Sequence, residues 1–144
     1  MFKSIVVGTD GSPTAEKAVE KAAELAETLG AKVHIVSAYE PNSVKVGGGF
    51  EERSQWMEAP GSTVDSSIER AVGMLRVKGL DVESYARKGN AAEALLDVAE
   101  ECGADLIIVG NKGMTGAKRF LLGSVPDKIS HHAPCCVLIV RTTG

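Results

Sequence analysis

The sequence predicts an α/β protein in which helices cover both faces of a parallel β-sheet, and three observations support this. Short runs rich in Ile and Val alternate along the chain with longer segments whose apolar residues recur every three or four positions. Aromatic residues make up only 4% of the 144 residues, so the core has to be built from Val, Ile, Leu and Ala. The run 104–110, ADLIIVG, is almost wholly apolar, which is typical of a strand buried on both faces of a sheet.

Start and stop signals bound the first three elements. The run 2–8 is rich in Ile and Val and leads into a turn signal, Thr-Asp-Gly. Ser12 can cap a helix that has Pro13 in its first position, where a missing N–H costs nothing. Gly30 is the stop signal of this helix, and the apolar run 32–39 is the second predicted strand.

The segment 41–61 interrupts the alternation. It contains three consecutive glycines, two prolines and the only tryptophan, Trp56. Two interpretations stay open, a lid over a ligand or a short helix at 51–57, because long structureless loops are uncommon in compact domains. Beyond this segment, apolar spacing and capping residues predict a helix at 62–78, a strand at 80–86, a helix opened by Asn90 and ended by Gly103, a strand at 104–110, a helix at 124–132 and a strand at 135–140.

Composition and charge exclude several classes of protein. The formal net charge is −3, whereas a nucleic-acid-binding domain usually carries a basic excess. No apolar run approaches the ~20 residues that span a bilayer, and the N-terminal run lacks the layout of a signal peptide. We therefore expect a cytoplasmic protein with neither nucleic acid nor membrane among its partners. The three cysteines form no C-x-x-C pair, so we expect reduced thiols that serve packing.

The stretch 109–124, VGNKGMTGAKRFLLGS, places four glycines between a predicted strand and a predicted helix. A glycine loop that leads into a helix N-terminus offers backbone N–H groups and a positive dipole end to a phosphate. Ser124 can cap the helix or donate to the phosphate, and three cations between the glycines add positive charge. The alternative is a loop that only needs turns. The spacing matches neither G-x-x-x-x-G-K-[ST] nor G-x-G-x-x-G.

The spacing of Gly110, Gly113 and Gly123-Ser124 resembles the G-x2-G-x9-G-[ST] motif of the nucleotide-binding universal stress proteins. The similarity extends through Val125-Pro126 into the closing strand and also covers the start of the chain, residues 5–12. The resemblance implies one domain over residues 1–144, with 41–61 as its variable loop. It also implies a three-layer, Rossmann-like sandwich whose five parallel strands, numbered along the chain, lie in the order 3-2-1-4-5.

The resemblance further implies an ATP site. The residues at the end of the first strand would lie under the nucleotide, with Asp10 facing the ribose or a phosphate-bound metal. The backbone of Ala38 would meet the adenine, and the glycine motif with the start of the last helix would hold the ribose and the phosphates. For Asp10 alone, local hydrogen bonding within the turn is the competing interpretation. The predicted site residues are Gly8, Thr9, Asp10, Ala38, Gly110, Gly113, Gly123, Ser124 and Val125.

On this resemblance the protein is a nucleotide-binding regulator of the stress response, with ATP as ligand and an accompanying Mg²⁺ left open. Cyclic AMP is the alternative ligand, because Pro126 removes one N–H from the first turn of the last helix. No second acid accompanies Asp10, so we expect no catalysis or at most slow ATP hydrolysis. Similar proteins form homodimers through the last strand, Cys136–Val140, which would otherwise be an exposed apolar edge. The downstream protein partner stays open.

Overall fold

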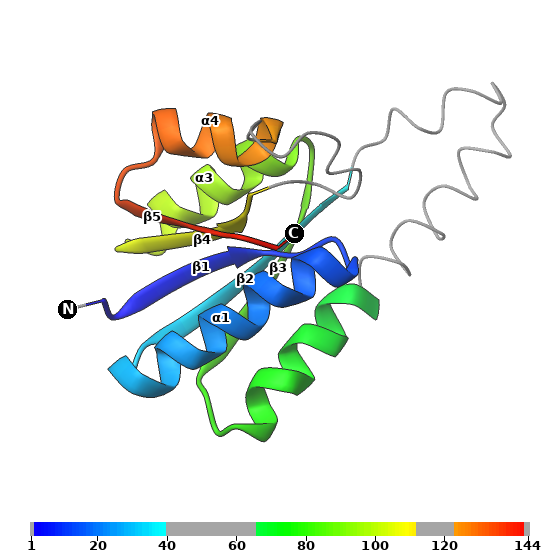
Figure 1. Cartoon of the computed structure of the whole chain (residues 1–144), viewed down its shortest axis with the longest axis vertical. Coiled ribbons are helices and arrows are strands. Elements are labelled where there is room, and N and C mark those ends of the chain that lie inside the picture. Colours follow the sequence, from blue (N-terminus) through cyan, green and yellow to red (C-terminus); the bar gives the residue numbers. More distant parts are fainter. Residues whose placement is uncertain (1, 40–65, 112–122, 143–144) are drawn as a thin grey trace, which may run out of the picture.

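The computed structural model describes residues 2–39, 66–111 and 123–142 (Figure 1). Within these residues, one five-stranded sheet has the order β3-β2-β1-β4-β5, and every neighbouring pair of strands is parallel. The predicted order 3-2-1-4-5 is therefore confirmed. The strands are β1 (Ser4–Gly8), β2 (Lys32–Tyr39), β3 (Val82–Lys88), β4 (Leu106–Gly110) and β5 (Cys136–Val140).

Helices cover both faces of the sheet, which confirms the predicted three layers. Helix α1 (Pro13–Leu29) and the helical segment 66–77 lie on one face, and α3 (Ala91–Glu101) and α4 (Ser124–His132) lie on the other (Figure 1). Two apolar clusters fill the spaces between the layers. Alternate side chains of the inner strands pack into the two clusters: Ile5 and Val7 face α1, and Val6 faces α3. This two-sided burial explains why the inner strands are continuous apolar runs.

The predicted helix ends follow from local capping. Ser12 accepts a hydrogen bond from the backbone N–H of Ala15 at 3.2 Å, and Pro13 opens α1. At the other end Gly30 adopts a φ of 69°, a left-handed conformation that costs glycine little. Asn90 caps the N-terminus of α3 as Ser12 caps that of α1, since its side chain accepts from Glu93 N–H at 3.2 Å. No described helix has the length and apolarity needed to cross a membrane.

All predicted strands except 32–39 start one or two residues later in the structure, and for two of them helix-ending hydrogen bonds use the first residues. The predicted strand 80–86 is found at Val82–Lys88, since Leu80 N–H bonds back to the carbonyl of Leu75 at 3.2 Å. The predicted strand 104–110 begins at Leu106, since Ala104 N–H bonds back to α3. The segment 41–61, with its two interpretations and Trp56, and the start of the predicted helix 62–78 lie outside the described residues.

Candidate functional site

A hollow of about 190 Å³ lies at the carboxyl ends of β1, β2 and β4. The strand order reverses here, since β1 is followed along the chain by β2 on one side but has β4 on the other. Open parallel sheets bind ligands at such a point, because the loops that leave the two strands diverge to opposite faces. A hollow of this volume is smaller than the ~300–1,000 Å³ of most ligand pockets, so a ligand the size of a nucleotide would extend beyond it.

The structure brings most of the predicted site residues to this hollow. Gly123 directly precedes Ser124 but is not one of the lining residues, and Gly113 lies outside the described residues. The predicted residues that line the hollow come from strand ends and from the first turn of α4: Gly8, Thr9, Asp10, Ala38, Gly110, Ser124 and Val125.

The apolar floor of the hollow was missed by the sequence analysis. Val36 and Val109 contribute from β2 and β4, and Leu95 contributes from α3. Leu95 packs over Gly8, where a Cβ atom would lie 3.2 and 3.3 Å from the two Leu95 methyl carbons. A larger residue at position 8 would therefore displace the Leu95 side chain. The sequence carries one usable signal for this floor: Ala15 and Ala18 line it from α1, and small residues near a helix start leave room for a ligand.

The turn between β1 and α1 is held by its own polar groups. Thr9 N–H donates to the carbonyl of Val36 at 2.9 Å, and the Thr9 hydroxyl accepts from Gly11 N–H at 3.1 Å. One carboxylate oxygen of Asp10 accepts from Ser12 N–H at 2.9 Å, the local bonding expected of an Asp in a turn. Asp10 is nevertheless exposed at the rim of the hollow, and the described residues supply no partner for its second oxygen. That oxygen can face a ligand.

The backbone of Ala38 points its polar groups into the space beyond the end of β1. Consecutive residues of a strand direct their N–H and C=O to opposite neighbours. The carbonyl of Tyr39 accepts from Gly89 N–H at 2.6 Å on the β3 side, and that of Val36 accepts from Thr9 N–H on the β1 side. The N–H and C=O of Ala38 point to the same side as those of Val36, and β1 ends at Gly8, opposite Val36. One donor and one acceptor are thus presented side by side to the hollow.

The start of α4 offers free backbone donors. Gly123 occupies the N-cap position, and no side chain of the described residues caps the helix. Among the described residues, the N–H groups of Ser124 and Val125 have no acceptor, while Pro126 has no N–H and Asp127 N–H bonds to the Gly123 carbonyl at 3.0 Å. Two N–H groups at the positive end of a helix dipole, next to an exposed Ser124 hydroxyl, form an arrangement that suits an anion.

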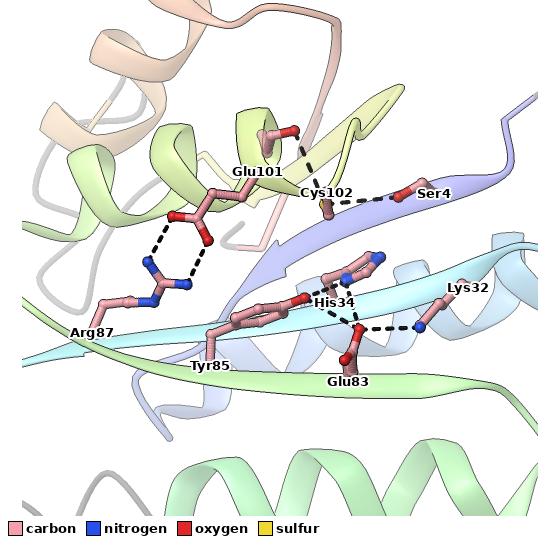
Figure 2. A network of polar contacts seen from close by, with 9 residues as sticks. Ser4, Lys32, His34, Glu83, Tyr85, Arg87, Glu101 and Cys102 are labelled. Atoms are coloured by element: carbon pink, nitrogen blue, oxygen red, sulfur yellow. Dashed lines mark hydrogen bonds and ion pairs between the residues drawn. The ribbon is translucent and has the colours of Figure 1, made fainter.

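A separate polar network lies between β2, β3 and α3 (Figure 2). The buried His34 bonds through Nδ1 to the Tyr85 hydroxyl at 2.9 Å, and burial lowers the pKa of His34. The Tyr85 hydroxyl also donates to Glu83 at 3.3 Å, and the hydrogen bond from Lys32 lowers the pKa of Glu83. None of these residues lines the hollow. The network holds the polar edge strand β3 against β2.

A paired contact adjoins this network (Figure 2). The Arg87 guanidinium makes two hydrogen bonds, of 2.8 and 2.7 Å, to the carboxylate of Glu101 at the end of α3. The same guanidinium lies 5.4 Å from the centre of the Tyr85 ring. These contacts join β3 to α3 and place no free charge at the hollow.

The chain belongs to the universal stress protein family, whose model matches residues 1–141, and this confirms the resemblance carried by the glycine motif. Universal stress protein Rv1636 of Mycobacterium tuberculosis is 35% identical, in an alignment that covers 99% of this chain and 98% of that protein. A solved universal stress protein in complex with cAMP is 30% identical with a TM-score of 0.74, covering 99% of this chain and 98% of that one. The solved protein MJ0577 is 26% identical with a TM-score of 0.85, covering 100% and 99%.

Proposed function

We propose that this protein binds an adenine nucleotide, with ATP as its ligand, and acts as a regulatory protein of the stress response. One observation carries the proposal: the hollow at the switch point of the sheet has an apolar floor with backbone donors at two of its margins. An apolar floor suits a flat base, and the uncapped start of α4 suits a phosphate. A nucleotide contains both a flat base and a phosphate.

The roles of the residues follow from their positions. The backbone donor and acceptor of Ala38 match the hydrogen-bonding edge of adenine, and Val36 and Leu95 pack against its ring. Gly8 and Thr9 lie beneath the nucleotide, and the free oxygen of Asp10 accepts from the ribose hydroxyls. Gly110 and Gly123 leave room for the ribose and phosphates, which the N–H groups of Ser124 and Val125 and the Ser124 hydroxyl bind. Gly113 lies outside the described residues, and the same role is proposed for it from the glycine motif alone.

Cyclic AMP is a second candidate ligand. A relative that is 30% identical over nearly the whole chain has been solved with cAMP. In this chain Pro126 leaves only two free N–H groups at the start of α4, and Asp127 adds a carboxylate to its first turn. A single phosphate group makes fewer demands on donors than a triphosphate does, and it is repelled less by that carboxylate.

An accompanying Mg²⁺ would be held mainly by the phosphates of ATP. Among the described residues, no group of three or more His, Cys, Asp or Glu side chains is placed to hold a metal ion. Asp10 can offer one oxygen, and Mg²⁺ bound to nucleotides commonly takes only one or two protein carboxylates. The same scarcity of acids favours binding over catalysis, with slow ATP hydrolysis as the most that these residues support.

We further propose a cytoplasmic homodimer built from single domains of residues 1–144. The edge strand β5 pairs with β4 on one side only, and its apolar residues 137–140 are merely half-buried. An exposed apolar edge is a hazard unless another strand covers it, and a second copy of β5 supplies that strand. Sedimentation of the wild-type chain tests this part, since a monomer at micromolar concentration contradicts it.

Calorimetric titration of the full chain with ATP, cyclic AMP and GTP tests the ligand. We expect an adenine nucleotide to bind more tightly than GTP, because the Ala38 donor and acceptor match the adenine edge. Ser124→Ala should weaken binding, since it removes a phosphate donor that caps nothing in the free protein. Ser130→Ala is the matched control, because Ser130 is also an exposed serine of α4, and its hydroxyl donates to the Asp127 carbonyl of the same helix. No binding of either adenine nucleotide at millimolar concentration would reject the proposal.

A further inference from the structure

Asn111, which directly follows β4, joins that strand to the start of α4 through its backbone. Its N–H donates to the Val140 carbonyl of β5 at 2.8 Å, and its carbonyl accepts from Gly123 N–H at 2.9 Å. Gly123 is the N-cap residue of α4. The start of α4 is therefore tied directly to the end of β4, although the residues between 111 and 123 lie outside the described part of the chain.

The side chain of Asn111 binds the segment that follows β5. Its Oδ1 atom accepts from Thr142 N–H at 2.8 Å and from the Thr142 hydroxyl at 3.1 Å. Thr142 is only 3% exposed and lies outside any strand, so no sheet partner satisfies its donors. The Thr142 carbonyl in turn accepts from Lys17 Nζ of α1 at 3.2 Å. All three polar groups of a buried threonine are thus used, two of them by one amide oxygen.

We infer that Asn111 and Thr142 form a clamp that positions the phosphate-binding start of α4, and this inference rests on the proposed nucleotide site. The clamp joins three elements whose residues line the hollow: Asn111 directly follows β4, its carbonyl binds Gly123 at the N-cap of α4, and the Thr142 carbonyl binds Lys17 of α1. Neither clamp residue lines the hollow itself. They are positioning residues, which act on the ligand by fixing where the Ser124 and Val125 donors lie.

The clamp predicts a pattern of variants with graded effects. Asn111→Leu removes the shared acceptor and leaves two buried donors of Thr142 unsatisfied. Thr142→Val has nearly the same shape and removes only the hydroxyl bond, so it is the milder variant if the first folds poorly. Thr142→Ser keeps both donors and should restore the wild-type behaviour. Thr28→Val is the matched control, because the Thr28 hydroxyl donates to the Glu24 carbonyl on the exposed surface near the end of α1.

Calorimetric titration with ATP, cyclic AMP and adenosine tests the clamp at a temperature where circular dichroism shows every variant folded. We expect the phosphate-bearing ligands to bind about tenfold more weakly to Asn111→Leu and ~threefold more weakly to Thr142→Val. Thr142→Ser and Thr28→Val should bind them as the wild type does. Adenosine affinity should not change in any variant, because adenosine has no phosphate for α4 to bind. An equal loss for adenosine would mean a general loosening of the fold and would overturn the positioning role.

Amide hydrogen exchange of the ligand-free protein separates failure of the clamp from failure of the proposed function. If α4 is held through Asn111, the Gly123 N–H should exchange faster in Asn111→Leu than in the wild type, with no change in Thr28→Val. If the wild type binds no adenine nucleotide, the proposed function fails whatever the exchange rates are. If the wild type binds and Asn111→Leu binds equally well, or if Gly123 exchange is unchanged, the clamp is overturned.

Discussion

Replacing Leu95 with Ala should cost less stability than the same replacement at Leu75, although both side chains are almost fully buried. Leu95 is 3% exposed and borders the hollow, whereas Leu75 is 0% exposed and lies within the apolar cluster under α1. Each substitution removes three carbons, worth about 2.4 kcal/mol at ~0.8 kcal/mol per buried carbon. At Leu75 a closed cavity adds to this cost, so we expect about 3–5 kcal/mol.

At Leu95 the removed carbons enlarge a hollow that already opens to solvent. Water can enter the enlarged space, so the cavity contribution is small and the loss should stay near 2–3 kcal/mol. Urea unfolding followed by circular dichroism measures both values, because a chain of this size usually unfolds in one cooperative step. The difference between the two variants is more reliable than either value, since the unfolded chains are nearly identical.

Ligand binding provides the second half of this prediction. Leu95→Ala should weaken adenine nucleotide binding about tenfold, because the base loses part of its apolar floor. Leu75→Ala should leave the affinity unchanged at temperatures where the variant is folded. Equal stability losses at the two positions would refute the assignment of Leu95 to the wall of an open hollow. Unchanged nucleotide affinity in Leu95→Ala would refute its place beneath the base.

Three further predictions concern other parts of the chain. Because burial lowers the pKa of His34, the unfolded chain takes up a proton below pH ~6.5 that the folded chain binds only at lower pH. The free energy of unfolding should therefore fall as the pH falls from 7.5 to 5.5. Urea midpoints of wild type and His34→Gln check this, and the same dependence of the midpoint on pH in both proteins would contradict it. Asn90→Ala should cost about 1 kcal/mol through the lost cap of α3, measured in the same way, and no loss would argue against the cap. In the monomer, at a protein concentration where sedimentation shows no dimer, iodoacetamide should label the exposed Cys136 before Cys135, because Cys135 is half-buried and burial raises its pKa. Peptide mass spectrometry reads the order, and faster labelling of Cys135 would be inconsistent with this structure.

The elements with signals in their own residues could be predicted closely. The cap at Ser12, the proline after it and the stop at Gly30 bound α1 as expected, because each signal acts within one helical turn. The strand 104–110 was placed by its apolar run but starts two residues late at Leu106. Its first residues are used by contacts that only the folded chain makes, including the bonds from Lys3 N–H and Ser4 N–H to the Asp105 carboxylate.

The candidate site also has parts that local sequence patterns predict and parts that depend on tertiary contacts. The glycine spacing from Gly110 to Ser124 is a local pattern, and it carried the resemblance that predicted the family and the sheet order. No local pattern could show that Leu95 lies over Gly8 or that Asn111 accepts both donors of Thr142. These pairs are far apart in the sequence, and their distances depend on how helices pack against an already ordered sheet. The sequence alone determined the elements and the motif, whereas tertiary packing decided the floor of the site and the contacts that hold its parts together, because side chains distant along the chain meet only after the layers have assembled.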